Sequence, residues 1–208
     1  MSAKSSPLSS PSADRSLADA LRARLAERTP IAEAADGARP AAVLVPLYHD
    51  GGQWRVLLNV RSQHLAEHKG EIAFPGGSME ESDADAQSCA LREAWEEMGI
   101  RPEDVDVLGA LDTVLTRTGF VVWPIVGAIP YPYDFKADPR EVAEAVHAPL
   151  RAFLDPASLR RERRAERDGA AADRVAYAWA GRLVYGATAV ILTQLLDAVR
   201  DIRRVDAA

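Results

Sequence analysis

Hydrophobic side chains recur at every fourth position near the start of the chain. Leu17, Leu21 and Leu25 have this spacing, which places them on one face of an α-helix. We therefore expect residues 16–38 to form an amphipathic helix, which packs on the main domain, followed by a connector. Residues 1–15 are rich in Ser and Pro and lack the apolar core of a signal peptide, so we expect a disordered tail.

The next part of the chain holds short apolar runs with many β-branched residues, separated by turn residues. Two strands are expected within 41–62, on either side of a His-Asp-Gly-Gly turn. A short strand should follow at 70–77, interrupted by Pro75, and further strands are expected at 105–115 and 120–130.

The residue pattern in the last third of the chain predicts two helices and a hairpin. The pattern indicates a short helix within 138–154 and a hairpin within 160–181 that turns at Asp168-Gly169. A long helix should cover 186–204, with Thr188 near its N-cap. Strands and helices without regular βαβ alternation favour a mixed α/β sandwich over a doubly wound parallel sheet.

Three glutamates, Glu93, Glu96 and Glu97, lie close together in one helical segment. A solvated helix surface is the simpler interpretation of these residues. Like charges at this spacing, however, destabilise a helix by about 0.2–0.5 kcal/mol per pair, which favours a bound cation that offsets this cost. Carboxylates at i, i+3 and i+4 suit a hard cation such as Mg²⁺. The turn Pro75-Gly76-Gly77 just upstream would let backbone carbonyls approach a bound ion.

The same segment is amphipathic. At about 100° per residue, it has one apolar side and one charged side. The apolar side holds Leu91, Ala94, Trp95 and Met98, and the charged side holds Arg92, Glu93, Glu96 and Glu97. Gly99 is suited to end the helix in the left-handed conformation.

Composition narrows the classes of protein. The formal net charge is −6 with a pI near 5.3, which argues against sequence-independent nucleic-acid binding, since that needs a basic face. The longest apolar stretch, at 120–130, contains Pro residues and is far shorter than the ~20 residues that span a bilayer. The single Cys89 cannot form an intrachain disulfide and is expected to be a core filler. We therefore expect a cytoplasmic protein.

The segment from Gly77 to Ile100 resembles the signature of the Nudix hydrolases. That signature is Gly, five residues, Glu, seven residues, then Arg-Glu-aliphatic-x-Glu-Glu-x-Gly-aliphatic. Here Asp83 replaces the first Glu, and eight residues separate it from Arg92. Both departures are similar to the coenzyme A diphosphatase branch.

An upstream motif strengthens this resemblance. The coenzyme A diphosphatases carry Leu-Leu-Thr-x-Arg-Ser before Gly-x-Val/Ile-x-Phe-Pro-Gly-Gly, and residues 57–77 read LLNVRSQHLAEHKGEIAFPGG. Asn59 stands in place of the threonine. A weaker resemblance continues to YGATAVIL, where Tyr185 occupies a position at which tryptophan is expected.

The resemblance implies an α/β fold for residues 39–204, the Nudix α/β/α sandwich with a mixed β-sheet. It also implies a Mg²⁺ or Mn²⁺ cofactor. The implied metal ligands are Glu93, Glu97, Glu96 and the carbonyl of Gly77. The implied catalytic residues are Arg92, which orients the glutamates, and the candidate bases Glu96, Glu141 and Glu144.

The expected substrate is coenzyme A or a thioester of it, cleaved to 3′,5′-ADP and 4′-phosphopantetheine by a pyrophosphatase reaction. The expected substrate-binding residues are Arg61, Ser62, Lys69, Gly76 and Gly77, with His64 and His68 as weaker candidates. ADP-ribose, dinucleoside polyphosphates and nucleoside triphosphates are alternative substrates, and a non-catalytic nucleotide-binding module is the alternative from another class. We expect no nucleic-acid or membrane partner, and a homodimer is left open.

A basic cluster at 160–164 has two interpretations. Its arginines would attract the phosphates of coenzyme A, or they lie on an exposed strand edge. We favour the strand edge because Glu162 interrupts the cluster.

Overall fold

Helices and strands follow one another irregularly in the computed structural model, which describes residues 11–33, 36–64, 69–165 and 171–205. The helices are α1 (Pro11–Ala26), α2 (Ala86–Met98), α3 (Leu150–Leu154) and α4 (Gly186–Val205), with short 3₁₀ turns η1 (Pro102–Asp104) and η2 (Pro156–Ser158). The strands are β1 (Arg39–His49), β2 (Trp54–Arg61), β3 (Ile72–Ala73), β4 (Gly76–Ser78), β5 (Asp106–Ala110), β6 (Val114–Leu115), β7 (Phe120–Ala128), β8 (Val142–Pro149), β9 (Leu159–Ala165), β10 (Ala171–Trp179) and β11 (Arg182–Val184).

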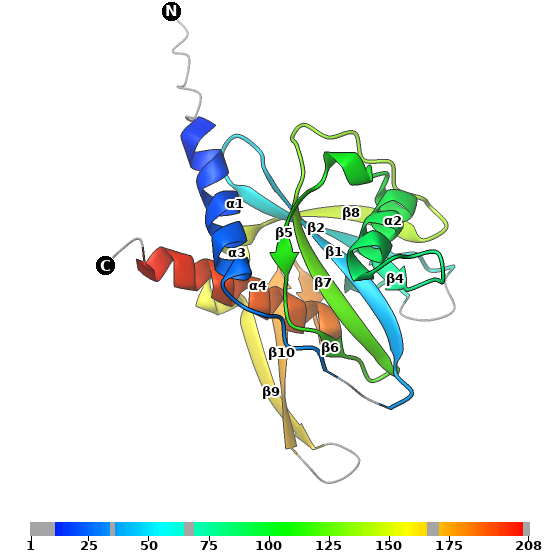
Figure 1. The fold of residues 1–208 in the computed structure, drawn as a ribbon. Helices are drawn as coiled ribbons and strands as arrows, with labels where there is room; N and C mark the ends of the chain where they lie inside the picture. Colours follow the sequence, from blue (N-terminus) through cyan, green and yellow to red (C-terminus); the bar gives the residue numbers. More distant parts are fainter. Residues whose placement is uncertain (1–10, 34–35, 65–68, 166–170, 206–208) are drawn as a thin grey trace, which may run out of the picture.

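The main sheet is mixed and is built around β1. Its central order is β3-β2-β1-β7-β5, with β8 paired to β2, β4 to β1 and β6 to β7. Strands β1 and β7 run parallel, and the other pairs in this sheet are antiparallel. Helix α2 lies on one side of the sheet, and α1 and α4 lie on the other (Figure 1). The predicted α/β/α sandwich with a mixed sheet is confirmed.

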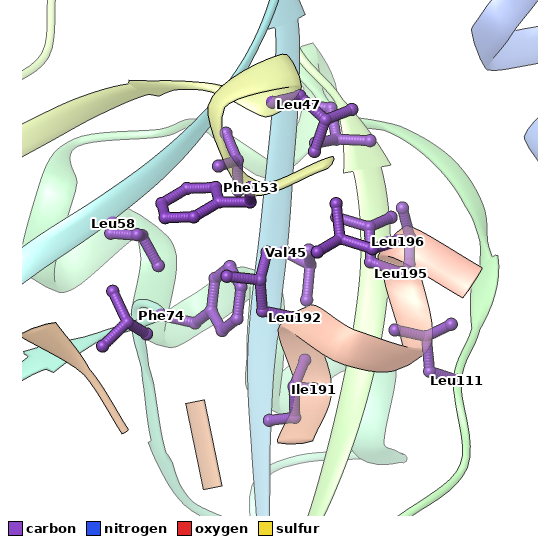
Figure 2. Packing of buried hydrophobic residues seen from close by; sticks show 14 of the residues in the cluster. Val45, Leu47, Leu58, Phe74, Leu111, Phe153, Ile191, Leu192, Leu195 and Leu196 are labelled. Carbon is purple, nitrogen blue, oxygen red and sulfur yellow. The ribbon is translucent and has the colours of Figure 1, made fainter. Parts of the chain in front are cut away.

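Alternation along β1 divides the core in two, because successive side chains of a strand point to opposite faces. Val45 and Leu47 face the side of α1 and α4, and Leu44 and Tyr48 face α2. Figure 2 shows the first of these cores, in which apolar side chains from α3 and α4 gather against β1. They include Phe153, Ile191, Leu192, Leu195 and Leu196. Full burial of such a side chain stabilises the fold by about 1.5–3 kcal/mol.

A second, smaller sheet holds β11, β10 and β9 in that order. The predicted hairpin is confirmed, since β9 and β10 pair antiparallel from Leu159 and Tyr177 outward. Its expected turn at Asp168-Gly169 lies outside the described residues. Arg160 and Arg161 lie on β9 at the edge of this sheet, and Arg161 is exposed, which agrees with the strand-edge interpretation of the basic cluster.

The prediction of a helix within 138–154 is wrong for most of this range. Residues 142–149 form strand β8, and only 150–154 are helical. Val142 and Ala145 face the α2 side, and Val146 and Ala148 face the other core. Pairing with β2 supplies the backbone hydrogen bonds of this segment, and Pro149 is incompatible with a helix interior.

Other boundaries differ in detail. Helix α1 begins at Pro11, five residues earlier than expected, and residues 1–10 of the expected tail lie outside the described residues. The strand expected at 105–115 is divided into β5 and β6. Thr188 lies inside α4, which begins at Gly186, rather than at its N-cap. Among the described residues, the helices are too short or too polar to traverse a bilayer.

Candidate active site

Helix α2 carries the glutamates and is fixed at both ends. The Asp85 carboxylate accepts a hydrogen bond from the Ser88 amide at 2.7 Å and caps the N-terminus. Gly99 ends the helix with φ of 69°, as predicted, and its amide donates to the Trp95 carbonyl at 2.9 Å. The register of the glutamates against the sheet is therefore well defined.

Arg92 is the cationic centre of the glutamate cluster. Its Nη1 donates to Glu93 at 2.9 Å and to Glu96 at 3.1 Å. Its Nε and Nη2 donate to the two oxygens of Asp83, both at 2.9 Å, in the bidentate geometry that suits a guanidinium. The positive charge that the clustered glutamates require is thus partly supplied from within the same helix.

Asp83 connects the loop before α2 to this cluster. Its side chain is 4% exposed, and it also accepts a hydrogen bond from the Glu80 amide at 2.8 Å. Hydrogen bonding to Arg92 lowers the pKa of Asp83 to about 2. Asp83 is shorter than the glutamate of the signature and is separated from Arg92 by eight residues instead of seven. It nevertheless reaches Arg92, so the structure accommodates both departures.

Glu97, which belongs to the side of the helix predicted to be charged, lies in the interior. It is 2% exposed, whereas the Glu96 side chain next to it is 54% exposed. Asn59 Nδ2, on β2, donates to Glu97 Oε2 at 2.7 Å, and the Gly76 amide also donates to this carboxylate. Burial raises the pKa of Glu97 to about 8, although the charge of Arg61 opposes that rise.

Gly76 and Gly77 let the site close tightly. A Cβ on Gly77 would lie 2.6–2.7 Å from the carboxyl atoms of Glu93, and a Cβ on Gly76 would lie 2.3 Å from the Ala42 carbonyl oxygen. Only glycine allows β4 to approach both β1 and α2 this closely. The Gly77 carbonyl faces the buried Cys89 sulfur at 3.7 Å, so Cys89 is a core residue, as expected.

The substrate-binding candidates lie near this cluster to different degrees. Arg61 ends β2 close enough to Glu97 for its charge to act on that carboxylate. Ser62 is 3% exposed and its amide donates to the Glu141 carbonyl. Lys69 and His64 are exposed, and His68 lies outside the described residues.

The two candidate bases outside the helix differ in their surroundings. Glu141 is exposed, and its backbone carbonyl accepts from the amide of Ser62 at 2.8 Å. Burial raises the pKa values of Glu93 and Glu97, and the charge of Glu141 adds to that rise. Glu144 lies on β8, and its carboxylate accepts from Arg182 at 2.8 and 2.9 Å. Glu96 has a 54% exposed side chain. Glu144 is as exposed as Glu96, so what separates it from the other two candidates is its pairing with Arg182.

The residues fit a divalent ion in their chemistry. The atoms that would bind the ion are carboxylate and carbonyl oxygens, which Mg²⁺ and Mn²⁺ prefer as ligands. Asn59 Oδ1, on the same amide that contacts Glu97, is buried and has no hydrogen-bond partner among the described residues. Across the described ranges, no three His, Cys, Asp or Glu side chains stand close enough together to hold an ion as they are placed here. Arg92 holds Glu93 and Glu96, while Asn59 holds Glu97.

Two features of this site were missed in the sequence. Trp95, assigned to the apolar side of α2, is 49% exposed, whereas Glu97 is buried. Asn59 was noted only as a departure from a motif. Its signal was a polar residue in the middle of an apolar strand, where an unpaired amide is costly to bury.

We expect the metal-free protein to lose stability as the pH rises because of Glu97. The folded-state pKa is about 8 and the ordinary value is 4.5, so the folded state binds more protons between these values and the free energy of unfolding falls across that range. Glu97→Gln removes this loss. With EDTA present, its melting temperature should exceed that of wild type by an increasing margin from pH 5 to pH 8.5, approaching roughly 9–18 °C at the upper end.

The matched control is Glu96→Gln, one position earlier on the exposed side of the same helix. Differential scanning fluorimetry of the three proteins measures the effect. A difference between Glu97→Gln and wild type that stays constant over this pH range would contradict the burial of an ionisable Glu97.

Comparison with known proteins identifies relatives of the chain. Residues 38–174 match the family model of the NUDIX domain. Two bacterial relatives, each described as an uncharacterized Nudix hydrolase NudL, come from Enterobacter sp. (strain 638) and Escherichia coli (strain K12 / DH10B). Each is 45% identical over 112 residues, which cover 54% of this chain and 58% of the relative. The match thus spans little more than half of the relatives' length.

A solved structure resembles the fold as well. The crystal structure of a MutT/nudix family protein from Enterococcus faecalis superposes with a TM-score of 0.50 and 14% sequence identity, covering 84% of this chain and 66% of that one. At this identity the likeness concerns the fold alone.

Proposed function

Because the chain belongs to the NUDIX family, we propose that it is a Mg²⁺- or Mn²⁺-dependent pyrophosphatase whose substrate is coenzyme A or a thioester of it. The products would be 3′,5′-ADP and 4′-phosphopantetheine, or its acylated form. The observation that carries the proposal is the contact between the upstream motif and the glutamate helix, since Asn59 Nδ2 of that motif donates to the buried Glu97 at 2.7 Å.

Each residue has a distinct role in this proposal. A bound divalent cation would neutralise charge on the diphosphate and make the attacking water more acidic. Glu93, Glu96 and Glu97, with the Gly77 carbonyl, would hold that cation. Arg92 orients Glu93 and Glu96 from one guanidinium, and Asp83 keeps Arg92 in place.

The reaction adds water across the phosphoanhydride. The oxygen of water forms a bond to one phosphorus, the bridging P–O bond breaks, and the bridging oxygen leaves with the second phosphate. Glu96 or Glu141 would accept the proton from water, since both are exposed to solvent at the edge of the cluster. Glu144 is a weaker candidate because both of its carboxylate oxygens accept from Arg182, whereas Glu96 gives only one oxygen to Arg92.

Arg61 is proposed to bind the diphosphate. It ends β2, two residues after Asn59, and its Nε is buried with no hydrogen-bond partner in the part of the chain that the structure describes. Charge-assisted hydrogen bonds contribute about 1.5–3 kcal/mol, so Arg61→Ala should lower kcat/KM by roughly tenfold to 150-fold. The loss should be similar for coenzyme A and ADP-ribose, because both contain a diphosphate.

Arg200→Ala is the control, since it removes an arginine from α4 on the other face of the sheet. Steady-state kinetics with both substrates measures the effect. A loss confined to coenzyme A would show that Arg61 instead reads the 3′-phosphate, which ADP-ribose lacks.

A substrate screen tests the choice of substrate. Purified protein with Mg²⁺ is assayed against coenzyme A, acetyl coenzyme A, ADP-ribose, diadenosine polyphosphates and nucleoside triphosphates. We expect the highest kcat/KM for coenzyme A or its thioester. A much higher value for one of the others would reject coenzyme A as the substrate and leave the pyrophosphatase reaction in place.

A further inference from the structure

Asn59 is a buried polar residue of β2, where its neighbours along the strand, Leu58 and Val60, are apolar. It is 1% exposed and lies on β2 between Ala73 of β3 and Ala145 of β8. Neither alanine side chain offers a polar group to the amide. Burying an amide without compensation costs about 1–3 kcal/mol, so its hydrogen bond must carry a specific benefit for the fold or for function.

The Asn59 amide bonds to the Glu97 carboxylate. Its Nδ2 lies 2.7 Å from Glu97 Oε2, and the Gly76 amide donates to the same group from β4. Two donors on separate strands fix the orientation of a carboxylate more tightly than one. Asn59 Oδ1, on the same amide, is buried and finds no hydrogen-bond partner within the described ranges. The bond to Glu97 therefore does not come from a position at which all polar atoms of Asn59 are satisfied.

We propose that Asn59 is a positioning residue of the cation site, which holds Glu97 in the orientation needed to bind the divalent ion. The inference rests on the proposed function, because it assigns Asn59 to the ion that the function requires. It adds a residue of β2 to a site whose ligands come from α2 and β4. Residues that orient metal ligands in this way typically change metal affinity by about 10–100-fold when they are replaced.

A pair of variants of equal shape separates positioning from packing. Asn59→Thr and Asn59→Val have nearly the same volume and both suit a strand, but only threonine retains a hydrogen-bond donor. Binding of Mn²⁺ alone, without substrate, is measured from the electron paramagnetic resonance signal of the free ion. We expect Asn59→Thr to bind within about fivefold of wild type and Asn59→Val to bind about 10–100-fold more weakly.

Thr113→Val is the control for the loss of a buried hydrogen bond elsewhere. Thr113 is 3% exposed, and its hydroxyl bonds the backbone of Glu33 and Ile31. This variant should melt at a lower temperature and retain wild-type affinity for Mn²⁺. If Asn59→Val fails to fold, Asn59→Ser and Asn59→Ala repeat the comparison with a smaller side chain.

The outcomes separate this inference from the proposed function. Equal affinities of Asn59→Thr and Asn59→Val for Mn²⁺, with tight binding by wild type, would overturn the role of Asn59 and leave the cation site intact. Failure of the wild-type protein to bind Mn²⁺ would overturn both.

Discussion

Replacing Glu97 with Gln is expected to lower kcat by at least about two orders of magnitude with Mg²⁺ present, since loss of about 3 kcal/mol of transition-state stabilisation exceeds a hundredfold in rate. Glutamine keeps the size of the side chain and can still pack between α2 and β2. It removes the negative charge that the proposed cation site uses. Glu97 is the most deeply buried of the three glutamates.

Turnover of the best substrate, measured at saturating Mg²⁺, gives the result. Glu103→Gln is the matched control, because Glu103 is an exposed glutamate in η1. The Glu97→Gln protein has to be shown to fold, and its melting temperature, measured separately with EDTA and expected to exceed that of wild type at high pH, provides that evidence. A folded Glu97→Gln protein with near wild-type turnover would remove Glu97 from the metal ligands.

Replacing Gly76 with Ala is expected to destabilise the protein by about 2–4 kcal/mol, because the new Cβ would overlap the backbone of the central strand. The Cβ would lie 2.3 Å from the Ala42 carbonyl oxygen and 2.6 Å from Val43 Cα. Backbone atoms of a paired strand cannot move aside as a flexible side chain can. A chain of this size should lose roughly 5–15 °C in melting temperature.

Gly119→Ala separates this steric effect from backbone strain. Gly119 has φ of 79°, and a Cβ added there would meet no atom of the described residues within 4 Å. The substitution therefore carries only the cost of the left-handed conformation, about 1–2 kcal/mol. Urea denaturation of both variants measures the difference. Equal destabilisation would contradict the close approach of β4 to β1.

Local patterns predicted the elements that depend on local chemistry. The end of α2 at Gly99 follows from the left-handed conformation that glycine permits, and the pairing of β9 with β10 follows from two runs of strand residues around a turn dipeptide. Strand β8 was missed because its three alanines and its one glutamate, Glu144, also suit a helix. Its pairing with β2, which lies far earlier in the chain, decides between the two, and this pairing is not visible locally.

The candidate site shows the same division. The charges of Glu93, Glu96 and Arg92 were readable from their spacing on a helix. The burial of Glu97 was not, because it depends on which strand lies beneath α2 and on the Asn59 amide that meets it there. The helical pattern likewise assigned Trp95 to the apolar side of α2, although the residue is 49% exposed and the buried positions of the helix include Ala94 and Met98 instead.

Identification of the products by mass spectrometry tests the central claim most directly. Wild-type protein is incubated with coenzyme A and Mg²⁺, alongside the same mixture with EDTA and a mixture containing Glu97→Gln. We expect equal amounts of 3′,5′-ADP and 4′-phosphopantetheine from the wild-type protein with Mg²⁺, and almost none from the other two mixtures. Wild-type protein that leaves coenzyme A, ADP-ribose, diadenosine polyphosphates and nucleoside triphosphates all intact with Mg²⁺ or Mn²⁺ would contradict the assignment as a pyrophosphatase.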